Sequence, residues 1–168
     1  KQAATASMIV AGQRKGGAMR LFLIYPEGNF IEATEDTPFL QIGEHKYGKP
    51  ILDRTITPTT SLEDATLCAL VSMDSTLRSN LSVGMPLDLS VLPVNSFNFS
   101  RLERIEDDDP AFDALSAEWS ASLSDAFARM REKINSQAAQ ERGQSPQQAQ
   151  AQQQMQQLIG EGQTFTQG

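Results

Sequence analysis

Two short segments in the first half of the chain carry the residues best suited to chemistry. The first is "IGEHKYGKP", in which Gly43 is followed by Glu44, His45 and Lys46. A carboxylate, an imidazole and an amine in adjacent positions can exchange protons with a substrate or bind its polar groups. Loops at strand ends often present such groups to ligands, but an ordinary solvated turn explains the same residues equally well.

The second segment is "RSNLSVG", which follows an apolar run with helical periodicity. Ser79 and Ser82 could direct their hydroxyl groups into a site at the end of that helix. The alternative is that the segment only terminates the helix, since Ser, Asn and Gly are typical of loops.

Other chemistries have less support in the sequence. One histidine and one cysteine, Cys68, cannot provide the ligand sets typical of a metal site, so we expect no metal. The stretch "GQRKGG" lacks the Gly-Lys-Ser/Thr ending of a phosphate-binding loop and is better explained as a hairpin turn. No G-x-S-x-G elbow surrounds a serine, which argues against a Ser-His-Asp triad that uses His45. We therefore expect no cofactor.

The composition narrows the range of partners. The chain has 168 residues, with 14 Lys+Arg against 21 Asp+Glu and a formal net charge of −7. Because it lacks a run of cations that could neutralise phosphates, we expect no nucleic-acid binding. A single cysteine is typical of a reducing compartment, which favours the cytoplasm. No apolar run approaches the roughly 18 residues of a membrane span, so we expect no membrane partner. The first residue is Lys1 rather than Met, and we expect the N-terminal part of the protein to be missing.

The elements that must position these segments follow from hydrophobic patterning. Short apolar or alternating runs predict strands over residues 6–12, 21–25, 30–34, 39–42 and 87–93. The run at 21–25 is continuous, which is typical of a strand buried on both faces. "PEGN" between the second and third runs is hairpin-turn chemistry.

Three helices are predicted. Pro50 favours the first turn of a short helix, and Thr60 with Glu63 forms a capping box for a second helix over 61–78 with one apolar stripe. Three aspartates before Pro110 favour the start of a third helix that ends near Ile134. The order of elements predicts an α+β fold with helices packed on a largely antiparallel sheet.

The last part of the chain differs in composition. Residues 135–168 are rich in Gln and Ala and carry few charges. Such a segment buries too little apolar surface to offset the entropy of ordering, so we expect a disordered or weakly helical tail. The predicted domain therefore spans residues 1–134, and 135–168 is a low-complexity tail.

Several motifs together resemble a known family. The segments "YPEGNF", "IGEHKYGKPILDR", "DSTLRSNLSVGMPLDL" and "RIEDDDPAF" are similar to those of Anbu, the bacterial proteasome-like ancestral β-subunit group. The resemblance covers about residues 7–134. It implies an N-terminal nucleophile hydrolase with an αββα sandwich, in which the first residue of the mature chain is a Thr whose hydroxyl attacks the scissile carbonyl while its own α-amino group acts as the base.

The resemblance also assigns roles to the first segment. Gly43 matches the first Gly of the family's Gly-Ser-Gly, Glu44 stands in the position of the Ser, and His45 and Lys46 replace the small residues that follow. These four positions are implied to bind substrate.

In the second segment, Arg78 matches the Arg of the family's Arg-Asp-x-x-Ser-Gly-Gly. Ser79 stands in the position of the Asp and Ser82 matches the Ser, so both are implied to support the nucleophile. The lost Asp suggests that Glu44 supplies the carboxylate that holds the α-amino group. The catalytic Thr itself has no counterpart in this chain, which we predict to be inactive alone.

The resemblance thus implies a subunit that hydrolyses peptide or isopeptide bonds within a self-compartmentalising homo-oligomer, either a ring or an open spiral. The stripe of Phe112, Leu115, Trp119 and Leu123 is a candidate subunit contact, with intramolecular packing as the alternative. A non-catalytic scaffold subunit of the same fold and a small-molecule amidase remain open.

Overall fold

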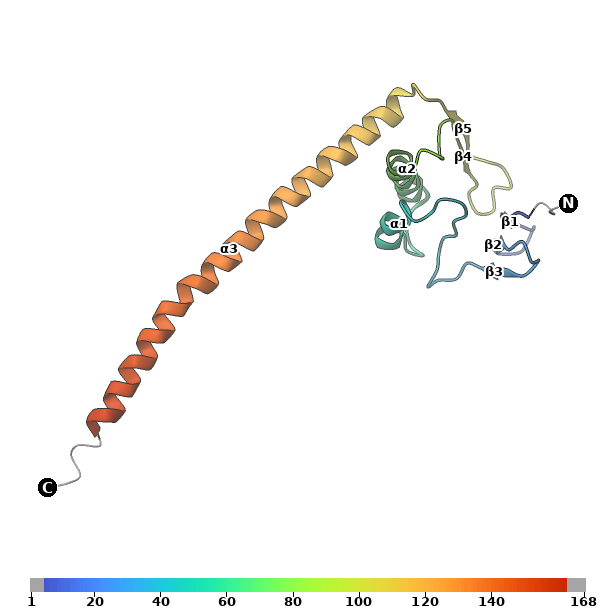
Figure 1. Ribbon diagram of the computed structural model, residues 1–168. Helices are drawn as coiled ribbons and strands as arrows, with labels where there is room; N and C mark the ends of the chain where they lie inside the picture. Colours follow the sequence, from blue (N-terminus) through green and yellow to red (C-terminus); the bar gives the residue numbers. More distant parts are fainter. Residues whose placement is uncertain (1–4, 163–168) are drawn as a thin grey trace. The chain divides into compact units, whose positions relative to one another are not determined.

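The computed structural model describes the backbone of residues 5–162 and the side chains of residues 5–138 and 140. It divides into two compact units, one up to Trp119 and one from Ser120 onwards. The elements, labelled in Figure 1, are β1 (Met8–Gln13), β2 (Met19–Ile24), β3 (Phe30–Glu32), α1 (Lys49–Thr55), α2 (Leu62–Ser79), β4 (Leu87–Val91), β5 (Arg101–Ile105) and α3 (Pro110–Gly162).

Strands β1, β2 and β3 form an antiparallel sheet in that order. The β2–β3 turn is closed by the Tyr25 amide, which donates to the Asn29 carbonyl at 2.9 Å, while Gly28 adopts a φ of 90° that a residue with a Cβ rarely tolerates. Leu23 lies opposite Ile9 in β1 and Ile31 in β3. The predicted hairpin is therefore confirmed.

The two faces of this sheet differ in burial. Leu23 is buried on one face, although Ile31 opposite it is 42% exposed. On the other face Met8, Val10 and Phe30 are 56%, 42% and 63% exposed. The pairing places Met8, Ile24 and Phe30 in one row across the sheet. Within β2 itself, Leu23 is the one buried residue, and Phe22 and Ile24 on the opposite face are only half-buried, so the prediction that this strand is buried on both faces is wrong within this chain.

The first helix begins as predicted, but the second begins at a different cap. Pro50 occupies the first turn of α1, as expected. The N-cap of α2 is Ser61 rather than Thr60: its hydroxyl accepts from the Asp64 amide at 3.0 Å and lies 2.7 Å from the Asp64 carboxylate. The capping motif of α2 is therefore Ser-x-x-Asp, one residue later than the predicted Thr-x-x-Glu capping box.

The buried face of α2 is more polar than the apolar stripe predicted. The residues of α2 that are buried are Val71, Ser72, Asp74 and Thr76. Helix α1 packs against α2, and Gly48, just before α1, approaches Ser72 so closely that only glycine fits at position 48. Leu62, a member of the predicted stripe, is instead 52% exposed.

One predicted strand is absent, and one observed strand was not predicted. Residues 39–42 are not paired as a strand, because no described strand lies beside them to complete a ladder. Strand β5 was not predicted, although it pairs antiparallel with β4 from Leu87 opposite Ile105 to Val91 opposite Arg101. Its sequence, "RLERI", has three charged residues and no regular alternation, and of its two apolar residues only Ile105 is buried, while Leu102 is 68% exposed.

Helix α3 begins where predicted, at Pro110, with Asp109 as its cap. The Asp109 carboxylate accepts from the amides of Ala111 and Phe112, both at 2.9 Å. The helix continues to Gly162 instead of ending near Ile134, since Gln and Ala are good helix formers. The division into a domain over 1–134 and a separate tail stays a prediction.

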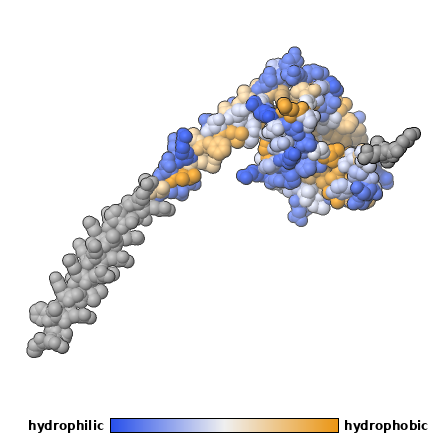
Figure 2. All heavy atoms as spheres, in the orientation of Figure 1, coloured by the Kyte–Doolittle hydropathy of each residue, from blue (hydrophilic) through white to orange (hydrophobic). Residues whose placement is uncertain are grey.

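In the second unit, α3 exposes an apolar stripe. Leu123, Phe127, Met130 and Ile134 follow one another at spacings of four, three and four residues and are 40–67% exposed. Figure 2 shows hydrophobic surface on this part of the helix. The structure as a whole confirms an α+β class with two small sheets and a long C-terminal helix, while the αββα sandwich stays a prediction.

Candidate functional site

The first candidate segment is a compact turn that leads into α1. Gly43 has a φ of 76°, in the left-handed region that favours glycine. Its carbonyl accepts from the His45 amide at 2.9 Å and lies 3.0 Å from the His45 Nδ1. The imidazole therefore folds back on the turn, and its remaining nitrogen, Nε2, is the one that a ligand could use.

The charged residues of the turn contact each other only loosely. Lys46 Nζ lies 3.5 Å from a Glu44 carboxylate oxygen and 5.2 Å from the centre of the Tyr47 ring. The side chains of Lys46 and Glu44 are 67% and 40% exposed. A pair this exposed contributes about 0–1 kcal/mol, so the Glu44 carboxylate can turn toward another cation at little cost.

Gly48 anchors the end of the turn. A Cβ added there would lie 2.0 Å from Ser72 Oγ and 2.6 Å from the Ser72 carbonyl oxygen, so only glycine fits. The Lys49 amide donates to the His45 carbonyl at 2.9 Å. The turn is therefore attached rigidly to α2, while its tip remains exposed.

The second candidate segment begins at the end of α2. The Asn80 amide donates to the Thr76 carbonyl, and the Asn80 side-chain oxygen accepts from the Ser82 amide at 2.9 Å and the Ser82 hydroxyl at 2.8 Å. These bonds fix Ser82 in an Asx turn. Ser79 and Ser82 are both exposed, so their hydroxyls are accessible to a partner.

Arg78 connects this segment to a buried carboxylate. Its Nε lies 3.2 Å from Asp74 Oδ1, and its Nη2 donates to Ser116 Oγ at 2.7 Å. Ser116 Oγ in turn donates to Asp74 Oδ1 at 2.5 Å. The Asp74 side chain is only 6% exposed, and its other oxygen, Oδ2, is buried with no hydrogen bond to any described residue. Sequence reasoning missed Asp74, whose only signal was its spacing of four residues before Arg78.

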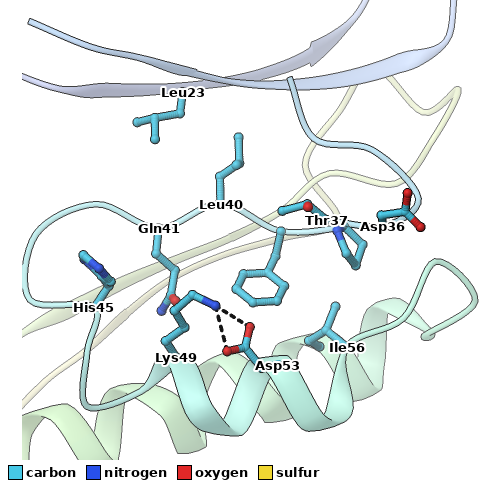
Figure 3. A pocket seen from close by; sticks show the side chains of 11 residues that line it. Leu23, Asp36, Thr37, Leu40, Gln41, His45, Lys49, Asp53 and Ile56 are labelled. Atoms are coloured by element: carbon cyan, nitrogen blue, oxygen red, sulfur yellow. Dashed lines mark hydrogen bonds and ion pairs between the residues drawn. The ribbon is translucent and has the colours of Figure 1, made fainter. Parts of the chain in front are cut away.

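A cavity of about 400 Å³ lies beside the first segment (Figure 3). Lys49 Nζ donates to both oxygens of Asp53 at 2.5 and 2.7 Å and lies 5.6 Å from the centre of the Phe39 ring. Figure 3 shows Gln41 beside the Lys49 side chain, and its Oε1 is buried without a hydrogen bond to a described residue. Of the residues predicted from sequence, His45 alone lines this cavity.

The structure does not join the two segments directly. Within residues 5–138 no hydrogen bond or ion pair connects residues 43–46 with Ser79 or Ser82. In the same range no cluster of three or more His, Cys, Asp or Glu residues could hold a metal ion. No described helix is both long and apolar enough to cross a membrane.

Comparison with known proteins gives one consistent group of matches. No protein-family model and no curated protein matches the chain. Among solved structures, Anbu from Yersinia bercovieri has 54% identity and a TM-score of 0.71 over 73% of this chain and 52% of its own. An Anbu mutant from Hyphomicrobium sp. strain MC1 has 55% identity and a TM-score of 0.74 over 76% and 56%.

The third structure is a helical assembly of the Anbu complex from Pseudomonas aeruginosa. It has 57% identity and a TM-score of 0.72 over 74% of this chain and 52% of its own. The chain thus spans just over half the length of these relatives. The resemblance inferred from the sequence motifs is confirmed.

Proposed function

Since this chain belongs to the Anbu group of proteasome-like β subunits, we propose that it is part of a threonine-type peptidase subunit. The subunit hydrolyses peptide or isopeptide bonds inside a homo-oligomer, in the cytoplasm. The observation that carries this proposal is the identity of 54–57% with Anbu proteins over about three quarters of the chain.

In this proposal the nucleophile comes from outside the 168 residues. A Thr hydroxyl attacks the carbonyl carbon of the scissile bond, and the α-amino group of the same Thr takes the hydroxyl proton and passes it to the leaving amine. Water then hydrolyses the ester and releases the Thr. The turn of Gly43, Glu44, His45 and Lys46 lines the substrate side of this site.

Glu44 has a specific role, which is to hold the protonated α-amino group. Its carboxylate lies 3.5 Å from Lys46 Nζ and its side chain is 40% exposed, so it is accessible to a second cation. Ser79 and Ser82 support the nucleophile from the end of α2, where the Asx turn at Asn80 restricts Ser82.

The αββα sandwich belongs to the same proposal. The face of the first sheet that exposes Met8, Val10 and Phe30 is suited to packing against a second sheet. Residues 39–42 have an unpaired backbone beside which a further strand could add. Segments outside this chain would supply both, which agrees with its covering about half of each relative.

The experiment uses the protein encoded with the sequence upstream of Lys1. We expect a Thr directly after the initiator Met or a propeptide, and covalent labelling of that Thr by a Thr-directed electrophile, located by mass spectrometry. Glu44→Gln should slow labelling sharply, whereas Glu27→Gln in the β2–β3 turn serves as a matched exposed control. Unchanged labelling of Glu44→Gln would refute its role.

The other outcomes separate the alternatives. A different residue at the mature N-terminus, with no labelling, would replace the enzyme with a scaffold subunit. Labelling without cleavage of a peptide library, but with hydrolysis of small amides, would favour an amidase. Self-association is tested separately by sedimentation, since the Pseudomonas aeruginosa relative forms a helical assembly.

A further inference from the structure

The loop that joins β4 and β5 exposes an unusual amount of apolar surface. Its sequence, "LPVNSFNFS", contains no charge. Val94, Phe97 and Phe99 are 60%, 51% and 54% exposed. Soluble proteins rarely place several large apolar side chains together on the surface unless the patch binds something, and exposed aromatic residues are frequent anchors of protein interfaces.

The backbone of this loop is strained. Asn95 and Phe97 have φ values of 62° and 53°. Asn tolerates the left-handed region, but for Phe this conformation is a true outlier. Strain of this kind persists only where the surroundings hold it, and it gathers at functional sites. Ser96 Oγ, at 2.7 Å from the carbonyl oxygens of both Pro93 and Asn98, braces the loop from within.

A second brace comes from the first sheet. The side-chain nitrogen of Gln13, Nε2, donates to Asn95 Oδ1 and to the Gly17 carbonyl, both at 2.8 Å. The side-chain oxygen of Gln13, Oε1, accepts from the Asn95 backbone amide at 2.6 Å. A cavity of about 210 Å³ lies beneath, lined in part by Met19, Phe97 and Phe99. The loop is thus held ready for binding, which lowers the entropy lost on association.

Charge indicates what kind of partner fits. Gln13 is followed by Arg14 and Lys15, both exposed, in a chain whose net charge is −7. At the other end of the β4–β5 hairpin, the run Glu106–Asp109 supplies four consecutive acidic residues, of which the first three are exposed. The hairpin has five residue pairs, so its two ends are separated by roughly 15 Å.

We propose that the β4–β5 loop of one copy binds the acidic end of the same hairpin on a second copy. Phe97 and Phe99 provide the apolar contact, and Arg14 and Lys15 face Asp107 and Asp108. Because the two surfaces lie at opposite ends of one element, the contact is heterologous and repeats from copy to copy, giving a ring or an open helix. The proposal rests on the homo-oligomer part of the proposed function.

The first test measures self-association of the 168-residue chain by sedimentation over a range of concentrations. Phe97→Ser should weaken association about 30-fold, as expected for truncation of an interface anchor. Gln13→Leu should weaken it as well, because it removes both bonds to Asn95 while leaving every exposed apolar side chain in place. Leu67→Ser, at an α2 residue that is 52% exposed, is the matched control and should leave association unchanged.

The second test exchanges charges. The double variants Arg14→Glu/Lys15→Glu and Asp107→Lys/Asp108→Lys should each associate about tenfold more weakly at low salt, and an equal mixture of the two should recover association. A chain that stays monomeric, variants that associate like the wild type, or a mixture without recovery would each overturn the proposal. If the chain associates but the variants have no effect, the homo-oligomer of the proposed function stands and only this interface is refuted. Labelling of the nucleophile tests the proposed function independently of the sedimentation and charge-exchange results.

Discussion

Gly48 provides a sharp test of how the first candidate segment is held. It precedes α1 with a φ of −92° and a ψ of −26°, a conformation that alanine adopts without strain. If only the backbone conformation mattered, Gly48→Ala should stabilise the protein by about 0.4–1 kcal/mol, because alanine restricts the conformations of the unfolded chain. The close approach to Ser72 predicts the opposite sign.

The magnitude follows from what the new methyl group would meet. Ser72 Oγ, at 2.0 Å, can rotate away, but the Ser72 carbonyl oxygen and carbon, at 2.6 and 3.1 Å, belong to the backbone of α2. Helices α1 and α2 must therefore move apart. Overpacking of this kind costs about 1–3 kcal/mol, which leaves a net loss of roughly 1–2 kcal/mol and a fall in melting temperature of roughly 5 °C.

The assay is urea and thermal unfolding followed by circular dichroism. Gly84→Ala is the control, because nothing lies within 4 Å of its added Cβ; it should be neutral or slightly stabilising. Ser72→Gly should rescue Gly48→Ala only in part, since the backbone contacts remain. If Gly48→Ala behaved like Gly84→Ala, the close packing of the turn against α2 would be refuted.

Three further predictions concern stability. Asp74→Ala should lower the unfolding free energy by about 1–3 kcal/mol, because Arg78 and Ser116 lose their shared acceptor, whereas Asp53→Ala, which breaks a half-exposed pair, should cost under about 1 kcal/mol in the same urea titration. Ser61→Ala should lower the unfolding free energy by about 1 kcal/mol, because it removes the cap of α2, while Glu63→Ala should change it by no more than about 0.5 kcal/mol. Equal losses in the two variants would favour the predicted capping box of Thr60 and Glu63 instead. The side-chain hydrogen bond from Arg20, together with the Arg20 charge, lowers the pKa of Glu32 below its ordinary value of 4.5. The pair therefore stabilises the fold at pH values above 4.5, and this stabilisation is lost as the pH falls through the lower pKa of the folded state. NMR titration should show that the Glu32 midpoint rises in Arg20→Met.

The sequence predicted local structure best where a signal is local. Pro50, Asp109 and the "PEGN" turn each act through neighbouring residues, and each lies where expected. The sequence predicted a strand at residues 39–42, but the structure has none. Strand formation depends on pairing with a second strand, and the residue pattern within the segment carries no information about that partner. The polar face of α2 was missed for a related reason: Ser72 is buried by the approach of Gly48, a contact between residues 24 positions apart.

The candidate site shows the same limit. The motif positions Gly43 to Lys46 and Ser79 to Ser82 could be read along the chain, but Asp74, Gln41 and the Lys49–Asp53 pair became candidates only through contacts. The one signal in the sequence was the spacing of four residues in Asp74–Arg78 and Lys49–Asp53, which also occurs in ordinary exposed helix pairs. Polar residues on predicted helices are usually solvated, and burial alone distinguishes Asp74 from Glu63 and Asp64, the exposed acids of the same helix.

Helix α2 supports both candidate segments from one short stretch. Ser72 fixes the approach of Gly48 and so the base of the first turn, and Asp74, two residues later, holds Arg78 at the start of the second. Thr76 accepts from the Asn80 amide that begins the Asx turn at Ser82. Because these anchors share one rigid helix, a substitution that tilts α2 must displace both segments together. The polar, buried half of α2 is therefore explained by positioning: its small side chains and its carboxylate hold two loops in place, which an apolar stripe could not do.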